Sequence, residues 1–257
     1  MRAIESVSAW RLERLAQIRS GLTLGLVPTM GALHDGHRSL VRRSQAENDR
    51  TLVSIFVNPP QFDDKSDLAE YPRPLENDLD VLRAEGVDFV FLPRELDLYP
   101  DGYNYRVAEH KLSQVLEGAH RPGHFDAVLT VVLKLLLIGS ADRAYFGEKD
   151  WQQLTLIQGM VDAFFLPTAI VPCATVRETD GLAISSRNGR LLPHQREQAP
   201  RFHRVLASAP TAQAACRELR AAGFAVDYVE DRDGRRLGAV RLGSVRLIDN
   251  VPLGDRP

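Results

Sequence analysis

The sequence predicts an α/β fold in which a doubly wound parallel sheet is followed by a small C-terminal α+β domain. Short apolar runs rich in β-branched residues alternate with segments of helical spacing as far as about residue 175, as βαβ units do. A polar turn follows at 177–188, and beyond it two predicted helices precede short strands. We therefore expect one domain at 1–176 and a second at 177–257.

The first half of the chain opens with a predicted amphipathic helix, because Ala9, Leu12, Leu15 and Ala16 recur at helical spacing. The run TLVSIFV is nearly continuous in apolar residues, which is typical of a strand buried on both faces. A polar loop is expected at 63–67. The predicted elements are helices at 3–19, 34–48 and 75–85, and strands at 24–28, 51–57 and 87–92.

The second half begins with a loop-rich region at 93–124. The run FDAVLTVVLKLLLI at 125–138 is apolar all round apart from Lys134, which predicts a buried helix. Another helix at 150–165 would begin at Asp150 as N-cap, with its inward residues at Leu154, Ile157, Val161 and Phe164. The remaining predicted elements are strands at 144–147, 170–175, 224–230 and 239–248, and helices at 193–207 and 211–222.

Composition narrows the function classes. The 257 residues carry a net charge of −2 and are 44% hydrophobic, so we expect a globular protein with no nucleic-acid or anionic-membrane partner. Cys173 and Cys216 are too few for a disulfide framework. No apolar run approaches the roughly 20 residues of a membrane span, and the N-terminus lacks an apolar signal core, so we expect a cytoplasmic protein.

The stretch LTLGLVPTMGALHDGHRSL at 22–40 organises the chain. An apolar strand, a turn containing Gly31 and a helix start follow one another, so that free backbone N–H groups and the helix dipole converge where an anion can sit. His34 and His37 would lie side by side on the first helical turn, which predicts a grip on nucleotide phosphates. A solvated helix start, or a zinc pair without its other ligands, remains the alternative for this stretch alone.

Three further clusters fall where predicted strands end. Lys149, in the segment GEKDWQQ at 147–153, would present a cation to a phosphate. The segment ISSRN at 184–188 suits a mobile clamp over a polyphosphate. Asn58 and Gln61 flank two prolines, and neutral amides there can read hydroxyls or a carboxylate. Taken singly, these could equally be a capped surface turn, a solvated linker and an ordinary loop.

Taken together and in order, the motifs resemble those of the pantothenate synthetase family, also called pantoate–β-alanine ligases. The resemblance spans essentially the whole chain, through PTMGALHDGH, SIFVNPPQF, YPR, RPGHF, FGEKDWQQL, VRETDGLAISSRN and RLIDN. It implies a Rossmann-like N-terminal domain of the HxGH nucleotidyltransferase superfamily, a small C-terminal domain that closes over the site, and a homodimer. The implied reaction joins (R)-pantoate to β-alanine through a pantoyl-adenylate, and consumes ATP to give AMP and pyrophosphate.

The resemblance also implies roles for individual residues. His37 is the expected catalytic histidine, assisted by His34 and Lys149. The expected ATP contacts are Met30, Gly31, Ala32, Leu33, His34, Asp35, Gly36, His37, Gly147, Glu148, Lys149, Asp150, Val176, Ile184, Ser185, Ser186 and Arg187. Gln61 and Gln153 are expected to bind pantoate, and Asn58 is a further expected substrate contact.

Mg²⁺ is expected on the ATP phosphates, with no protein side chain assigned as its direct ligand. Asp78 is a candidate outer contact to this ion, and a salt-bridged surface carboxylate is the alternative. The sequence departs from the family pattern at Ala127, Leu137, 139–141, Ala174, Arg190 and around 236–240. These departures bear on the pocket near Ala127 and on the stability of the small domain.

Two alternatives stay open at this point. Another HxGH-type enzyme could transfer a nucleotidyl group to a phosphorylated substrate, although it would not require Gln61 and Gln153. A non-enzymatic nucleotide-binding module would bind ATP without releasing AMP. A tRNA-charging enzyme is disfavoured, because the chain has no room for an anticodon-binding domain and is slightly acidic.

Overall fold

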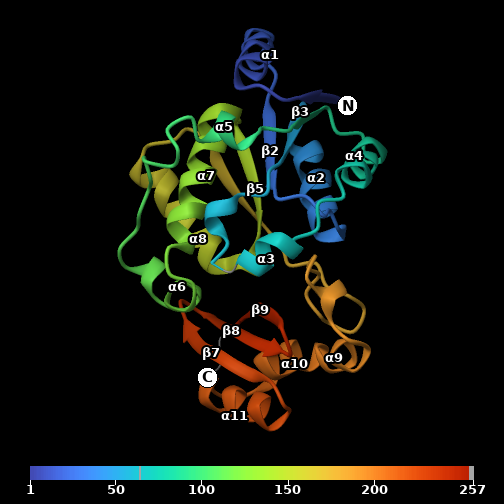
Figure 1. Cartoon of the computed structure of the whole chain (residues 1–257), viewed down its shortest axis with the longest axis vertical. Helices are drawn as coiled ribbons and strands as arrows, with labels where there is room; N and C mark the ends of the chain where they lie inside the picture. Colours follow the sequence, from blue (N-terminus) through green and yellow to red (C-terminus); the bar gives the residue numbers. More distant parts are fainter. Residues whose placement is uncertain (64, 255–257) are drawn as a thin grey trace. The chain divides into compact units, whose positions relative to one another are not determined.

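The computed structural model describes residues 1–63 and 65–254, which form two compact units (Figure 1). The sheet unit comprises Met1–Gly147 and Gln152–Cys173, and the C-terminal unit comprises Glu148–Trp151 and Ala174–Pro257. The change of unit after Cys173 falls three residues before the boundary expected after residue 176. The transfer of Glu148–Trp151 to the second unit is a feature that the sequence did not indicate. Residue 64 of the predicted loop and residues 255–257 of the predicted second domain lie outside the described residues.

The sheet unit contains a wholly parallel sheet, which confirms the predicted doubly wound, Rossmann-like α/β fold. Within the described ranges it has six strands in the order β1-β4-β3-β2-β5-β6. The strands are β1 (Arg2–Ile4), β2 (Leu24–Thr29), β3 (Arg50–Ile55), β4 (Phe89–Phe91), β5 (Arg143–Gly147) and β6 (Ala169–Cys173).

The strand order reverses beside β2. The chain builds β3 and β4 on one side of β2, and it then returns to place β5 and β6 on the other side. Open parallel sheets bind ligands beyond the carboxyl ends of their strands at such a reversal. Within the sheet unit, the segment that leaves β2 after Thr29 and the residue Gly147 at the end of β5 therefore lie at the edge where such sheets bind ligands.

Helices cover both faces of this sheet, with α7 and α8 on one side and α2 and α4 on the other (Figure 1). Residues from α2 and α4 pack with the strands in a core that includes Leu40, Leu82, Val27 and Val90. The helices of the first 163 residues are α1 (Val7–Arg19), α2 (Asp35–Glu47), α3 (Lys65–Glu70), α4 (Leu75–Ala84), α5 (Glu95–Leu98), α6 (Glu117–His120), α7 (His124–Gly139) and α8 (Trp151–Ala163). Short 3-10 turns are η1 (Pro59–Gln61), η2 (Leu112–Gln114) and η3 (Glu148–Asp150). As predicted, α7 is buried on most of its surface.

The N-terminal segment differs from its prediction in two ways. The helix begins only at Val7, because Ser6 caps it by accepting a hydrogen bond from the backbone N–H of Ala9, and residues 2–4 form β1 instead. The face predicted to be inward is wrong, since Leu12 is 72% exposed. The buried face contains Trp10 and Arg14; the Arg14 guanidinium donates to the carbonyls of Leu22 and Ser140 and to Asp142.

Other predicted boundaries shift for local reasons. The loop expected at 63–67 gives way to α3 at Lys65, and the loop-rich region contains two short helices, α5 and α6. In α8, Leu154, Ile157 and Val161 are buried as predicted. Phe164 is 53% exposed, because the helix ends at Ala163.

The C-terminal unit packs helices on an antiparallel sheet that has three strands among its described residues. Its elements are η4 (Asn188–Arg190), α9 (Pro193–Gln198), α10 (Pro200–Ser208), α11 (Ala212–Ala221), β7 (Ala225–Arg232), β8 (Arg235–Leu242) and β9 (Val245–Pro252). The single helix expected at 193–207 is divided by Pro200, which cannot continue the hydrogen-bond ladder of α9. The strand expected at 239–248 is also wrong, because the chain turns at Gly243, where φ is +58°.

Residues in two of the segments that depart from the family pattern, 139–141 and 236–240, make defined contacts in the structure. Arg236 is 1% exposed, and its guanidinium binds Asp231 and the carbonyls of Leu206 and Ala209. The sequence there thus places a buried arginine inside the small unit, paired with a carboxylate whose side chain is 35% exposed. In the sheet unit, the carbonyl of Gly139 accepts from the indole of Trp10.

Candidate active site

The turn after β2 is held by a carboxylate from α4. Asp78 is 1% exposed, and its two oxygens accept the backbone N–H groups of Ala32 and Leu33, each at 2.8 Å. The N–H of Gly31 donates to the hydroxyl of Thr29 at 3.2 Å. The prediction of free backbone N–H groups is therefore wrong for these three positions. The interpretation of Asp78 as a surface carboxylate is wrong as well.

Glycine is required at position 31 for two reasons. Its φ is +77°, which L side chains rarely adopt, and a Cβ there would lie 2.9 Å from the Asp78 carboxylate. Ala32 also has a positive φ, of +50°. Asp78 thus holds a strained turn in place.

The two histidines lie on the first turn of α2, as predicted. His34 is the N-cap residue, and the rings of His34 and His37 stack with centroids 4.0 Å apart. A Cβ on Gly36 would lie 2.9 Å from Cε1 of His34, so the glycine between the histidines makes room for the imidazole. The spacing of the motif is thus explained by packing as well as by helix geometry.

The hydrogen bond at the helix start determines the tautomer of His37. The backbone N–H of His34 donates to Nδ1 of His37 at 3.3 Å, so that Nδ1 carries no proton. The neutral ring then carries its proton on Nε2. His37 is therefore prepared to donate a hydrogen bond through Nε2, beside the positive end of the helix dipole.

Gln61 is held by a buried amide, which is held in turn by a buried phenol. Its Oε1 accepts from Nδ2 of Asn58 at 3.1 Å, and its Nε2 lies 2.8 Å from the Met30 sulfur. Asn58 is 1% exposed, and its Oδ1 accepts from the hydroxyl of Tyr99 at 2.7 Å. Burial raises the pKa of Tyr99, which keeps it a donor. Asn58 supports Gln61 in this structure, and its predicted contact with substrate requires its surroundings to move.

The backbone of Gln61 is fixed by the RPGHF motif. Nδ1 of His124 donates to the Gln61 carbonyl at 2.8 Å, and Arg121 reaches the same oxygen at 3.2 Å. Arg121 also pairs with Asp63 at 2.9 Å and contacts Nε2 of His124 at 3.1 Å. Burial, followed by the charge of Arg121, lowers the pKa of His124 to about 4. His124 is therefore neutral near pH 7.

The two glutamines at the start of α8 do different things. Gln152 is 4% exposed, donates to the carbonyls of Leu112 and Val115, and accepts from the N–H of Glu117. It pins the loop before α6. Gln153, the predicted pantoate contact, is half-buried.

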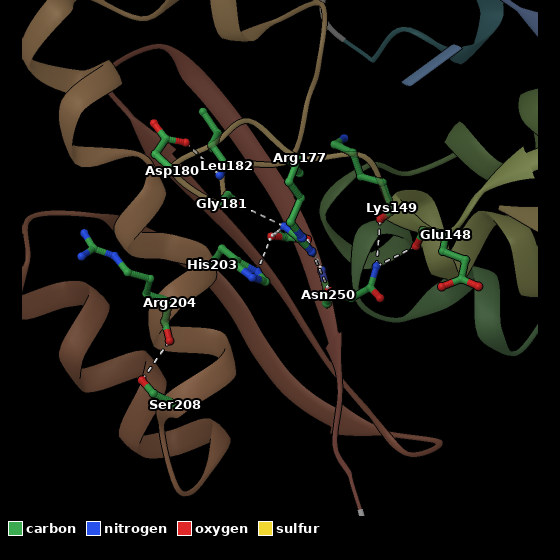
Figure 2. A network of polar contacts seen from close by, with 12 residues as sticks. Glu148, Lys149, Arg177, Asp180, Gly181, Leu182, His203, Arg204, Ser208 and Asn250 are labelled. Atoms are coloured by element: carbon green, nitrogen blue, oxygen red, sulfur yellow. Dashed lines mark hydrogen bonds and ion pairs between the residues drawn. The ribbon is translucent and has the colours of Figure 1, made fainter. Parts of the chain in front are cut away.

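Lys149 lies in η3, within the C-terminal unit. The backbone carbonyls of Glu148 and Lys149 accept hydrogen bonds from the side-chain amide of Asn250 on β9, at 2.8 and 3.0 Å (Figure 2). Arg235 pairs with Glu148 at 2.8 Å, and its guanidinium lies 3.8 Å from the centre of the Trp151 ring. The backbone of Lys149, the predicted phosphate-binding cation, is therefore hydrogen-bonded to strand β9 of the C-terminal sheet.

The predicted clamp at 184–188 belongs to a hydrogen-bonded turn at 176–188 in the same unit. Arg177 bridges to Ala183, and the N–H of Ile184 donates to the carbonyl of Val176 at 3.0 Å. Gly181 turns the chain with a φ of +94°. Ser185 accepts from the N–H of Arg187 at 3.3 Å. Mobility of this segment stays a prediction.

The structure brings the predicted residues together in two groups. In the sheet unit, the Met30–His37 segment contacts Gln61 through Met30, and Gly147 ends β5. In the C-terminal unit, η3 holds Glu148, Lys149 and Asp150, while 176–187 form the turn described above.

No group of three or more His, Cys, Asp or Glu side chains among residues 1–63 and 65–254 is placed to hold a metal ion. Asp78 directs its carboxylate at backbone amides, which does not favour its predicted contact with Mg²⁺. Over the same residues, no helix has the length and apolar character needed to cross a membrane.

Sequence reasoning missed several supporting residues. Asp78 was considered as an outer metal contact or as a salt-bridged surface carboxylate, although its position after a proline in a first helical turn indicated a carboxylate near a helix start. Arg177 and Asp249 lie in the quoted motifs VRETDG and RLIDN, yet no role followed from the sequence. Their pairing at 2.7 Å joins residues 72 positions apart, which no local pattern encodes.

Comparison with known proteins places this chain among close relatives. The family model described as pantoate-beta-alanine ligase matches residues 1–252. Pantothenate synthetase from Bdellovibrio bacteriovorus is 51% identical over 253 residues, which cover 98% of this chain and 98% of that protein. Pantothenate synthetase from Coxiella burnetii is 46% identical over 255 residues, with 98% and 96% covered.

Solved structures agree with these relatives. A crystal structure of pantoate-beta-alanine ligase from Francisella tularensis, complexed with beta-gamma ATP and beta-alanine, matches with a TM-score of 0.93 at 39% identity. The match covers 98% of this chain and 98% of that chain. Pantothenate synthetase from Thermus thermophilus matches with a TM-score of 0.88 at 40% identity, over 98% of this chain and 99% of that one.

Proposed function

We propose that this chain, which belongs to the pantoate-beta-alanine ligase family, joins (R)-pantoate to β-alanine through a pantoyl-adenylate intermediate. ATP is the second substrate, and the products are pantothenate, AMP and pyrophosphate. The observation that carries the proposal is the stacked pair His34 and His37 at the N-terminus of α2, in a chain matched by the family over residues 1–252.

The first half-reaction is transfer of an adenylyl group. A carboxylate oxygen of pantoate attacks the α-phosphorus of ATP; the new acyl–phosphate bond forms as the bond to the β-phosphate oxygen breaks, and pyrophosphate leaves. Two anions must approach one another, so the protein has to supply positive potential and donors where charge collects. His37 donates from Nε2 to phosphoryl oxygens, and the N-terminus of α2 adds its dipole.

Lys149 provides the point charge for the phosphates. Ser185, Ser186 and Arg187 add hydroxyl and guanidinium donors, while Gly147, Glu148, Asp150, Val176 and Ile184 are proposed as nucleotide contacts. Mg²⁺ bound to the phosphates would neutralise part of the remaining charge. The proposal assigns no side chain of this protein as its ligand.

The second half-reaction forms the amide. The amine of β-alanine attacks the acyl carbon of the mixed anhydride, AMP leaves, and the amine loses a proton. Gln61 and Gln153 are proposed to hold pantoate through both steps, and Gln61 also helps to position β-alanine. Because Gln61 is braced by Asn58 through its side chain and by His124 through its backbone, it can keep one orientation throughout.

The decisive test is AMP formation from ATP that depends on both pantoate and β-alanine, together with ATP–pyrophosphate exchange that depends on pantoate alone. Exchange with pantoate supports the adenylate route. A nucleotidyl transfer to a phosphorylated acceptor, with no exchange in the presence of pantoate, would contradict it.

The roles of two residues are tested by substitution. His37→Ala and Lys149→Ala are each expected to lower kcat/KM for ATP by at least about a hundredfold, as loss of a group that stabilises transition-state charge does. The free energy of unfolding measured in urea is expected to change by less than about 1 kcal/mol, because both side chains are half-buried and outside the core. His110→Ala and Lys111→Ala, at exposed positions, are the matched controls. Near-control activity in either test variant would remove that residue from the mechanism.

We also propose a cytoplasmic homodimer, as the sequence resemblance implies. Light scattering coupled to size-exclusion chromatography distinguishes a particle of twice 28.7 kDa from a monomer.

A further inference from the structure

The dipeptide Asp249-Asn250 on β9 belongs to the RLIDN motif and has no part in the proposed reaction steps. Both side chains are almost completely buried, at 4% and 3% exposure. Successive side chains of a strand point to opposite faces, so the two residues can act on different segments. Buried polar side chains in adjacent positions need hydrogen-bond partners, and here the partners lie in the two segments of the unit that are proposed to bind phosphate, 148–150 and 176–188.

Asn250 is bound to the segment that contains Lys149. Its Nδ2 donates to two consecutive backbone carbonyls, those of Glu148 and Lys149, and Figure 2 shows the amide directed at both oxygens. Its Oδ1 accepts from Arg235 at 2.5 Å, and Arg235 in turn pairs with Glu148 and covers the ring of Trp151. All the polar atoms of the Asn250 amide are thereby engaged with this segment or with the arginine that holds it.

Asp249 is bound to the beginning of the 176–188 turn. Its carboxylate accepts from both terminal nitrogens of Arg177, at 2.7 and 2.9 Å, and lies 3.2 Å from Nδ1 of His203. Arg177 also donates to the carbonyl of Gly181 (Figure 2). Burial raises the pKa of Asp249, but the interactions with His203 and Arg177 outweigh burial and hold this pKa below its usual value. The carboxylate is therefore ionised at neutral pH.

We propose that Asn250 is a positioning residue for Lys149, and that the Asp249-Asn250 pair fixes the Lys149 segment and the 176–188 turn to one strand. The inference rests on the proposed function of Lys149. A lysine side chain has four rotatable bonds that must be ordered when its ammonium binds a phosphate. Fixing the carbonyls of Glu148 and Lys149, which flank the Cα of Lys149, reduces the freedom of the backbone from which the ammonium extends. The spacing between Lys149 and the start of the turn is then set by β9.

The test uses Asn250→Asp and Asn250→Ala in the full-length enzyme. The aspartate keeps the oxygen that faces Arg235, but it replaces the donor with an acceptor opposite two carbonyls. The alanine removes both functions. We expect kcat/KM for ATP to fall about tenfold in both variants, the effect of losing two ordinary hydrogen bonds, while KM for pantoate stays within about twofold of its original value.

The matched control is Gln198→Ala, which removes another amide-to-backbone hydrogen bond in the same unit, from Gln198 to the carbonyl of Ala222. Gln198→Ala is expected to lower the melting temperature about as much as Asn250→Ala does, without changing KM for ATP. If Gln198→Ala and Asn250→Ala lower stability and ATP kinetics alike, a general loss of stability accounts for the result and the proposal is overturned.

A double-mutant cycle separates the inference from the proposed function. If Asn250 acts through Lys149, Asn250→Ala has an effect of less than about twofold when Lys149 is already alanine. A full tenfold effect in the Lys149→Ala background overturns the positioning role and leaves the function of Lys149 intact. If Lys149→Ala alone leaves ATP kinetics unchanged, the assignment of Lys149 fails first and the inference falls with it.

Discussion

Replacement of Asp78 tests how the β2–α2 turn is maintained. The carboxylate accepts two backbone N–H groups at 2.8 Å, beside a glycine at φ +77° and an alanine at φ +50°. Hydrogen bonds to a charged acceptor contribute about 1.5–3 kcal/mol each, and the lower value applies here because the turn is only partly buried. Asp78→Ala removes both bonds and is expected to cost about 3 kcal/mol. Asp78→Asn keeps one acceptor and places a donor against the second N–H, at a cost of about 2 kcal/mol.

The functional consequence follows from the position of this turn, which leads directly into His34. If the turn relaxes, the stacked histidines lose their fixed start, so Asp78→Asn is expected to raise KM for ATP as well as to lower the urea midpoint. Asp80→Asn is the matched control, since Asp80 lies on the same helix with its side chain 73% exposed and pairs with Arg83 at the surface. Equal midpoints and equal KM values for the Asp78→Asn and Asp80→Asn proteins would refute the anchoring role.

Two further predictions concern His124 and Gly36. The pKa of His124 is about 4 in the folded protein, against an ordinary value of 6.5, so between these pH values the unfolded chain binds the additional proton. The free energy of unfolding therefore falls as the pH is lowered through this window, by about 1.4 kcal/mol per pH unit and about 3 kcal/mol in all. Urea titrations at pH 7, 6 and 5 should show a smaller loss of stability for His124→Gln than for the original protein, and parallel curves would contradict the buried neutral form. Gly36→Ala adds a Cβ 2.9 Å from the His34 ring, so it should lower kcat/KM for ATP at least tenfold. It should also raise the free energy of unfolding by up to about 1 kcal/mol, because alanine is the better helix former; unchanged activity would show that the ring accommodates the methyl group.

The sheet unit was largely predictable because its strands are buried on both faces and its helices have clear periodicity. The same reasoning failed for α1, where the apolar positions Leu12 and Leu15 are exposed and Arg14 is buried. Periodicity assigns an arginine to the solvent, whereas this guanidinium finds two carbonyls and the carboxylate of Asp142. Strand β1 was missed because three residues are too few for an alternation to be seen.

In the C-terminal unit one local signal was available and was not used. Asp233-Gly234 separates β7 from β8, both residues have positive φ, and Asp-Gly between two strands is a strong hairpin signal. The membership of Glu148–Trp151 in this unit was not predictable in the same way. It depends on Asn250 and Arg235, which lie about a hundred and about ninety residues further along the chain.

The candidate site shows the same division between local and long-range information. The positions of His34 and His37 follow from helix spacing alone, and the stacking of their rings agrees with it. The bracing of Gln61 by His124, and of the β2–α2 turn by Asp78, joins residues 63 and about 45 positions apart. Short motifs predicted which residues would meet ligands, and the fold was needed to identify what holds those residues.

The anion-binding capacity of the stretch after β2 consequently lies further along the chain than the glycine turn suggests. The N–H groups of Gly31, Ala32 and Leu33 are already used by Thr29 and Asp78, so a phosphate can gain their hydrogen bonds only by displacing a buried hydroxyl or a buried carboxylate. The positive end of the helix dipole lies beyond them, at the start of α2, beside the Nε2 donor of His37. Within 30–37, the turn therefore serves mainly to present the histidines, and ATP binding should depend more on positions 34, 36 and 37 than on the side chains at 32 and 33.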